Sequence, residues 1–401
     1  MKKLFMLGLA LSALSLWAGN SIFSYYGFPV QFYGRDIYSM GMGDTGASDM
    51  FRYNTGYANP AQSNRSNKSL FGTGIIAGYT SYKSEYQSTT RKFRDDALDF
   101  PYFSVSVPIL RHRIGFQFNS IASGVVDNQF THPDSTIERQ EAEKYLYRAD
   151  LIYSYTYKNL SLGLSGNYYF GHDNRTFEQT SPTNTVPTRE SLLKSYKNPT
   201  LTIGALQSFD KHSVGLHATL PVTLKGESKR SSTHTTEDPV DVSYDLPMQV
   251  VASYTALPIP QFKVSADASY DLYSQVDDSM RDGIKLGLGM AYEPELDQKY
   301  WYRSIPLRLG YWYRQLPFED TSGENIDENA FTAGLSLPLK NKISRVDLAV
   351  QYLQRGSMDT NKLSDNSLMF MFGITGFDIF SKAPDRTAPR DIPVAEDVQS
   401  W

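Results

Sequence analysis

Hydrophobic and polar residues alternate along most of the chain. In YLYRADLIYSYTYK (residues 145–158), every odd-numbered position is apolar or aromatic, whereas the even-numbered positions include Arg148, Asp150 and Ser154. The same alternation runs through residues 262–273 and 345–354. A period of two that is sustained over about ten residues is typical of a β-strand. Each run also has roughly the 9–11 residues with which a tilted strand crosses a membrane.

This pattern predicts an all-β chain with about fourteen strands. The strands are expected at residues 69–81, 100–110, 113–126, 144–158, 160–171, 199–209, 212–224, 241–256, 261–274, 283–293, 304–315, 329–338, 344–354 and 366–380.

The connections between these strands alternate in length. Short ones, such as 158–159 and 210–211, are followed by long polar ones, such as 172–197 and 225–239. Short turns at one end and long loops at the other are typical of a transmembrane antiparallel β-barrel, with the short turns in the periplasm. One connection in the short class, 295–304, is longer than expected. A soluble β-sandwich also shows period-two strands, but its strands are usually shorter and its loops need not alternate.

The composition favours the same class of protein. The 28 tyrosines and 22 phenylalanines suit the edges of a bilayer, where amphipathic rings are stable. The mean hydropathy of −0.41 and the lack of a long apolar run after the N-terminus exclude a helical membrane protein. A formal net charge of −4 provides no basic surface for nucleic acid. Without cysteine there is no thiolate metal site.

No motif predicts an enzyme. His212 and Ser213 are adjacent, but neighbouring residues of a strand point to opposite faces, so they cannot act as base and nucleophile. We therefore expect no catalytic residue, no cofactor and no metal site.

Residues 1–18 have the features of a secretory signal peptide. A basic MKK is followed by the apolar run LFMLGLALSALSLWA, which is too short to span a membrane. We expect export to the outer membrane of a Gram-negative-type bacterium. An even number of strands then leaves both termini in the periplasm.

Residues 19–68 contain no clean transmembrane strand before the expected barrel domain at 69–380. Their spacing of Gly41, Gly43 and Gly46 matches a dinucleotide fingerprint, G-x-G-x-x-G. Such a fingerprint needs a buried strand before it and an acidic residue about twenty positions later, and both are missing. We interpret the segment as a plug that folds into the barrel lumen, because small residues allow a chain to bend and pack closely.

Alternation also identifies polar side chains that face the lumen. The candidates are Arg148, Asp150, His217, Lys263, Asp267, Asp271, Lys285, Arg308, Arg314 and Asp347. One interpretation is a solvated or mutually paired wall. The other is that some of the cations bind a carboxylate headgroup or hold the plug.

Two prolines, Pro221 and Pro247, fall in neighbouring predicted strands. Proline cannot donate to a β-ladder and is unusual inside a sheet. Either both lie near loop ends of the strands, where pairing is ending, or they mark a weakened seam in the wall.

Two short motifs in residues 19–68 support a family resemblance. Gly34, Gly41, Gly43, Gly46, Ala47 and Asp49 stand in GRDIYSMGMGDTGASD, and Asn59, Pro60 and Ala61 lie just before the first strand. With the barrel pattern, the chain resembles the FadL family of outer-membrane transporters for long-chain fatty acids and other hydrophobic compounds. The resemblance implies passive transport of a hydrophobic ligand, with the plug as a gating hatch. It also implies contact with outer-membrane lipid or, in solution, detergent.

Related barrels of the type IX secretion system share this hatch pattern. A non-transporting scaffold that anchors or docks secreted proteins is therefore the alternative hypothesis. Residues 381–401 follow the last strand with three prolines and mixed charge, and we expect a disordered periplasmic tail that is a linker or binds a partner. The long loop at 172–197 has only Leu192 and Leu193 as an apolar pair, so no apolar docking groove is evident.

Overall fold

The computed structural model describes residues 35–53, 58–62, 68–86, 89–183, 186–295, 300–320, 322–339 and 343–377. The expected signal peptide, Gly34 and the expected tail lie outside the described residues. Within the described part of the chain, no helix is long and apolar enough to cross a membrane.

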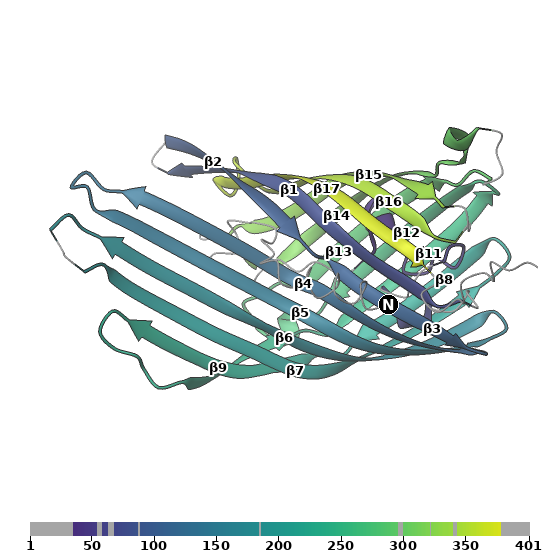
Figure 1. The fold of residues 1–401 in the computed structure, drawn as a ribbon, viewed down its shortest axis with the longest axis horizontal. Helices are drawn as coiled ribbons and strands as arrows, with labels where there is room; N and C mark the ends of the chain where they lie inside the picture. Colours follow the sequence, from purple (N-terminus) through teal and green to yellow (C-terminus); the bar gives the residue numbers. More distant parts are fainter. Residues whose placement is uncertain are drawn as a thin grey trace, which may run out of the picture.

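Seventeen strand segments form one antiparallel sheet, which closes because β1 pairs with β17 (Figure 1). The segments are β1 (Leu70–Tyr86), β2 (Thr89–Asp99), β3 (Tyr102–Ile109), β4 (His112–Thr131), β5 (Ile137–Tyr157), β6 (Leu160–Thr180), β7 (Thr188–Ser208), β8 (His212–Thr219), β9 (Val222–Ser232), β10 (Val240–Leu246), β11 (Gln249–Ile259), β12 (Phe262–Asp271), β13 (Gly283–Tyr292), β14 (Leu307–Glu319), β15 (Asn325–Pro338), β16 (Arg345–Ser357) and β17 (Leu363–Phe377). Short helices are α2 (Ile37–Met40), η2 (Pro60–Gln62), η3 (Tyr273–Gln275) and η4 (Trp301–Ser304).

Three pairs of segments are halves of single wall strands. β2 and β3 both pair with β1, and the break between them contains Pro101. β8 and β9 are separated at Pro221, and β10 and β11 at Pro247. Counted this way, the wall is an all-β, closed, fourteen-stranded antiparallel barrel, as the sequence pattern predicted.

The two prolines singled out in the sequence interrupt strands that then resume. Val222 pairs with Leu246 on one side of the break, and Thr219 pairs with Gln249 on the other. The explanation that pairing is ending there is wrong, because β9 and β10 continue beyond the break. The break fits the absence of an N–H group on proline, which removes a rung of the ladder.

Several segments expected as long polar loops are paired strands instead. β2 occupies most of 85–98, and the ends of β6 and β7 occupy most of 172–197. Outside a bilayer both faces of a strand meet water, so apolar and polar residues no longer alternate although backbone pairing continues. The expectation of loops was therefore wrong at these positions.

The wall has two parts: a closed barrel, and a group of strands that project beyond it without closing. Near the end of the barrel where β1 begins, β3 and β8 are each 8 residues long and β12 has 10, close to one membrane thickness. We call this part the belt. Farther out, β4 pairs only with β5 after Ser120, and β10 pairs only with β9, among the registers of the described residues. The outer parts of β4–β7 with β9 and β10 therefore form a projecting sheet, toward the left in Figure 1.

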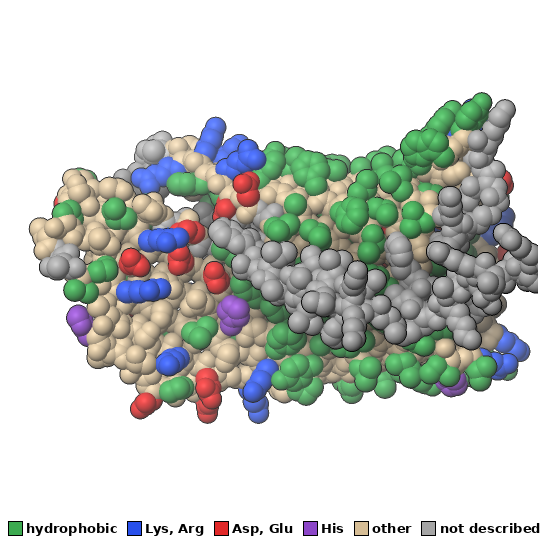
Figure 2. All heavy atoms as spheres, in the orientation of Figure 1, with side chains coloured by type: hydrophobic (Ala, Val, Ile, Leu, Met, Phe, Trp, Pro, Cys, Tyr) green, Lys and Arg blue, Asp and Glu red, His purple; other side chains and the backbone are tan. Residues whose placement is uncertain are grey.

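The outer surface follows the same division. Figure 2 shows hydrophobic side chains gathered over the belt and charged side chains toward the projecting end. Outward residues of the belt include Leu151, Leu288 and Leu309, whose exposed fractions are 63%, 61% and 59%. A broad exposed apolar surface of this kind is stable only in a hydrophobic environment.

Candidate functional site

The N-terminal segment, residues 35–53 and 58–62, contains the glycine motif and begins with a single helical turn. Asp36 caps α2 by accepting a hydrogen bond from the backbone N–H of Ser39 at 2.9 Å. Gly43 and Gly46 then adopt positive φ angles of 69° and 107°. These conformations favour glycine, so the motif reverses the chain direction locally.

The same glycines allow backbone to pack directly against the wall. A Cβ atom on Gly43 would lie 2.2 Å from the carbonyl oxygen of Leu288 in β13. Reciprocally, a Cβ atom on Gly310 in β14 would lie 2.0 Å from the backbone nitrogen of Gly43. Both partners must lack a side chain for this contact. Close packing against the wall therefore explains the glycine spacing, and a nucleotide site is not needed to explain it.

Asn59, Pro60 and Ala61 occupy a second close contact with the wall. The Asn59 amide donates to the Ala205 carbonyl oxygen at 3.3 Å, and its side-chain oxygen accepts from the Ala61 N–H at 2.9 Å. Gly204 lies beside Asn59, where an added Cβ atom would be 2.2 Å from the Asn59 side-chain oxygen. The second predicted motif therefore also lies against wall glycine.

Asp267, a predicted lumen residue, holds the middle of the segment. It accepts hydrogen bonds from the Arg35 guanidinium at 2.7 Å, the Gly46 N–H at 3.2 Å and the Ala47 N–H at 3.0 Å. Nearby, Ser48 contacts Ser253 of β11, with 2.9 Å between the two hydroxyl oxygens.

Tyr38 on α2 lies in the densest group of charges. The Arg308 and Arg345 guanidinium groups stand 4.1 Å and 5.0 Å from the centre of its ring, and the Lys263 ammonium is 4.8 Å away. Cations over an aromatic face are attracted by the ring quadrupole, more strongly when water is absent. The Tyr38 hydroxyl donates to Glu293.

Each cation at this contact has a carboxylate partner. Lys263 lies 2.9 Å from Asp49, Arg345 lies 2.9 Å from Asp347, and Lys285 pairs with Asp44. The groups balance in number: cations Arg35, Arg52, Lys263, Lys285, Arg308 and Arg345, and carboxylates Asp36, Asp44, Asp49, Asp267, Glu293 and Asp347. Pairing of this kind makes burial of so many charges tolerable.

Two carboxyl groups outside the membrane-spanning strands illustrate the strength of this pairing. Burial alone would raise the pKa of Asp36, but the Arg52 guanidinium outweighs it and holds that pKa well below the usual range. Burial likewise opposes ionisation of Glu293, yet the Lys263 ammonium lowers its pKa to about 2. Both groups are therefore ionised at neutral pH.

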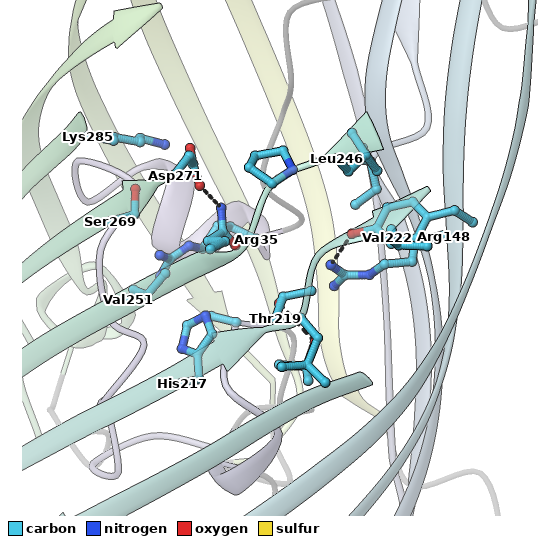
Figure 3. A pocket seen from close by; sticks show the side chains of 17 residues that line it. Arg35, Arg148, His217, Thr219, Val222, Leu246, Val251, Ser269, Asp271 and Lys285 are labelled. Carbon is cyan, nitrogen blue, oxygen red and sulfur yellow. Dashed lines mark hydrogen bonds between the residues drawn. The ribbon is translucent and has the colours of Figure 1, made fainter. Parts of the chain in front are cut away.

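A small cavity lies between the N-terminal segment and the outer half of the lumen (Figure 3). Its volume is about 60 Å³, and Figure 3 shows Arg35 and His217 on one side with Val222 and Leu246 on the other. His217 is buried, and its Nδ1 atom has no hydrogen-bond partner among the described residues. The cavity thus has a polar side and an apolar side.

The apolar side belongs to a cluster that lines the outer lumen. Its buried members are Ile121, Ala122, Leu146, Tyr169, Val222, Leu224 and Leu246. Ile121 stands at a register shift in β4, where pairing with β3 has ended. Val222 and Leu246 flank the proline breaks. The apolar lumen surface therefore meets the wall where the wall is interrupted.

The other residues that were predicted to face the lumen lie at several different positions. Arg148 and Asp271 line the cavity, and Arg148 pairs with Asp150 at 2.8 Å. Arg314 pairs with Glu328. Among the described residues there is no group of three or more His, Asp or Glu side chains able to hold a metal ion.

Sequence reasoning missed several residues of this contact. Arg35, Asp36, Tyr38 and Arg52 were not singled out, although charged residues in a glycine-rich segment are a usable signal. The wall glycines that the segment packs against were missed as well, among them Gly163, Gly204, Gly287, Gly289 and Gly310. An isolated glycine within an alternating strand indicates close approach of another backbone, which is the signal that could have found them.

Known structures share this architecture. A FadL homologue from Pseudomonas aeruginosa is 12% identical, with a TM-score of 0.66 over 87% of this chain and 99% of that one. The toluene transporter TodX from Pseudomonas putida is 15% identical, with a TM-score of 0.61 over 86% of this chain and 98% of that one. The monoaromatic hydrocarbon channel CymD is 15% identical, with a TM-score of 0.56 over 86% and 97%.

At these identities the structures establish a common fold. No curated protein matches the chain. The family model BamG matches residues 1–379, which is nearly the whole chain. The chain belongs to the BamG family, and its barrel has the same fold as the FadL homologue and TodX.

Proposed function

We propose that this chain is a passive outer-membrane channel for hydrophobic small molecules, such as long-chain fatty acids. In this proposal the N-terminal segment is the gating hatch, and both termini lie in the periplasm. The observation that carries the proposal is the apolar surface of the outer lumen, which meets the wall at its interruptions. Barrels of the same fold include proteins named as transporters of toluene and channels for monoaromatic hydrocarbons.

The cavity size is consistent with a closed state in this proposal. A volume of about 60 Å³ holds a few water molecules, whereas a cavity that admits benzene measures roughly 150 Å³. A hydrophobic molecule could pass only after part of the lumen moves. Movement of the hatch would enlarge the cavity, because Arg35 of the hatch lines it directly. No covalent step is required.

A reversible cross-link tests the hatch without altering its charges. Ser48 on the hatch and Ser253 on β11 place their hydroxyl oxygens 2.9 Å apart, so cysteines at both positions can form a disulfide. The chain has no other cysteine. The matched control joins Ser191 and Ser231, which are 2.7 Å apart on β7 and β9 of the projecting sheet.

The measurement is uptake of a labelled fatty acid and of toluene into liposomes that contain each variant. Oxidation should abolish uptake for the hatch pair, and reduction should restore it, while the control pair transports in both states. Equal uptake by the oxidised and reduced hatch pair would reject gating by the hatch. No uptake by any variant or by the unmodified chain would reject transport itself.

The alternative is a sealed barrel that serves as a scaffold for partner proteins. The balanced ion pairs between hatch and wall favour it, because moving the hatch would expose many buried charges. This hypothesis predicts no uptake of any hydrophobic compound, together with specific co-purification of a stable partner. Loss of that partner when the projecting sheet is altered, with the belt intact, would support it.

A further inference from the structure

The cavity between the N-terminal segment and the outer lumen has two hydrogen-bonding groups that no described residue satisfies. They are the Nδ1 atom of His217 and the hydroxyl of Ser269. Both residues are more than nine-tenths buried, with exposed fractions of 6% and 8%. Burial of a polar group without a partner is unfavourable, so a group that completes these hydrogen bonds would be bound.

Strand pairing brings the two groups to the same wall of the cavity. His217 of β8 pairs with Val251 of β11, and Val251 pairs in turn with Ser269 of β12. Lys285 of β13 continues this row, because it pairs with Ser269. All four residues line the cavity, and Figure 3 shows them along one side of it. The register of the sheet therefore fixes where a ligand would find hydrogen-bonding partners.

The charges around the cavity do not favour an anion. Each Lys or Arg of the lining already has a carboxylate partner, and the pairs are Arg35 with Asp267, Arg148 with Asp150, and Lys285 with Asp44. Asp271 of the lining adds a fourth carboxylate to these three cations. A ligand carboxylate would add negative charge to a buried site whose described cations are already paired, and this is costly.

The opposite side of the cavity is apolar. Ile121, Val222 and Leu246 line it, and all three belong to the cluster of the outer lumen. The volume of about 60 Å³ admits a small head group, whereas a cavity that holds benzene measures roughly 150 Å³. A hydrocarbon chain attached to such a head group would have to extend along the apolar side.

We propose that this cavity binds the hydroxyl group of an uncharged amphiphile, such as a long-chain primary alcohol. A hydroxyl both donates and accepts hydrogen bonds, so it can complete His217 in either tautomer or the Ser269 hydroxyl, whereas a carboxylate only accepts. A pure hydrocarbon leaves both groups unsatisfied. The proposal rests on the proposed channel function and narrows its ligands to neutral hydroxylated compounds.

Three photoreactive probes with the same chain separate the possible head groups. They are 1-octanol, octanoate and octane, each with a diazirine on a middle carbon, used at about pH 8, where octanoate is ionised. Each probe is irradiated with the full chain in detergent micelles, and the labelled peptides are identified by mass spectrometry. Labelling of Leu288 and Leu309, which face outward from the belt, corrects for differences in partition between the probes.

We expect the alcohol to label the peptides with Val222 and Leu246 about tenfold more strongly, relative to the belt, than octane or octanoate does. This is the upper range for one net hydrogen bond. Excess unlabelled 1-octanol should remove this labelling and leave that of the belt unchanged. His217→Phe should lower the ratio to that of octane. His212→Phe, at an exposed position of the same strand, is the matched control and should not change it.

Stronger labelling of the cavity by octanoate would overturn the proposal and assign the site to the lumen cations. Equal labelling by the three probes, or none in the cavity, would also reject it. Ser269→Ala is a second, milder variant that should reduce the advantage of the alcohol even if His217→Phe does not fold. Labelling by the alcohol in a chain without uptake would reject transport and keep this site, whereas uptake without labelling would reject only this site.

Discussion

The contact between the N-terminal segment and the wall, called the hatch contact after the proposed role of that segment, and the projecting sheet both contain many ion pairs, but in opposite surroundings. Lys263 and Asp49 meet with both side chains fully buried, at 0% exposure each. Arg139 and Asp127 meet on the projecting sheet with 49% and 46% of their side chains exposed. The two distances are similar, 2.9 Å and 2.7 Å.

The difference shows that distance alone does not indicate what an ion pair contributes. Water screens the exposed pair and solvates either partner when the other is removed. The buried pair has no such substitute, so removing one partner leaves an uncompensated charge. The hatch contact therefore depends on each of its charged residues. The projecting sheet does not depend on any single charged residue in the same way.

The largest expected effect comes from removing one buried cation. Lys263→Met leaves Asp49 and Glu293 without their ammonium partner, and we expect a loss of about 3–5 kcal/mol in stability or in hatch docking. Arg139→Met, which removes an exposed cation of the projecting sheet, should change nothing measurable. Heat-induced unfolding in detergent, followed by gel mobility, compares the two variants. Equal midpoints would contradict the distinction between the two regions.

A smaller effect is expected from a single methyl group on the wall. Gly310→Ala places a Cβ atom against the Gly43 backbone, where neither atom can move without displacing a strand or the hatch. Overpacking of this kind costs about 1–3 kcal/mol. Gly166→Ala is the control, because no atom lies within 4 Å of its added Cβ atom. Protease cleavage of the hatch should increase in the first variant only.

Restoring the missing rungs of the wall should have a modest effect on stability. Pro221→Val with Pro247→Val supplies two N–H donors at the break, each worth about 0.5–1.5 kcal/mol if bonded. If molecules leave through this break, uptake should fall while stability rises slightly. Pro317→Val in β14, away from the cavity, serves as the control. Unchanged uptake in the double variant would exclude the break as an exit.

Mild acid should have the smallest effect. The lowered pKa values of Asp36 and Glu293 mean that their stabilisation is complete above the unfolded-state values, about 3.9 and 4.3. It is lost only as the pH falls through the lower folded-state values. Emission of Trp312, which lies 4.8 Å from the Lys285 ammonium beside the hatch, should stay constant from about pH 7 to 5. A change within that range would contradict the assigned pairing.

Much of the wall could be predicted because the bilayer imposes a simple pattern. Residues 145–157 alternate because one face meets lipid and the other the lumen, and β5 covers them. The ends of β6 and β7 could not be predicted, because both of their faces meet water and polar residues carry no period. These strands continue only through hydrogen bonds between their backbones, and such bonds leave little trace in the sequence.

The hatch contact was predictable in its small residues and not in its partners. Gly43 was identified from spacing, Asn59 from the family resemblance and Asp267 from alternation. Which residue meets which depends on the positions of strands that are far apart in sequence, and alternation gives only the face of each residue. The pairing of Arg35 with Asp267, separated by 232 positions, therefore needed the tertiary structure.

The sequence by itself determined the class of protein, the approximate number of wall strands and the side of each strand that faces the lumen. These follow from local periodicity, which the solvent on each face imposes residue by residue. Only the tertiary structure decided where the wall is interrupted, which glycines receive the hatch and which charges neutralise one another. Those features depend on how the closed sheet brings distant strands into contact.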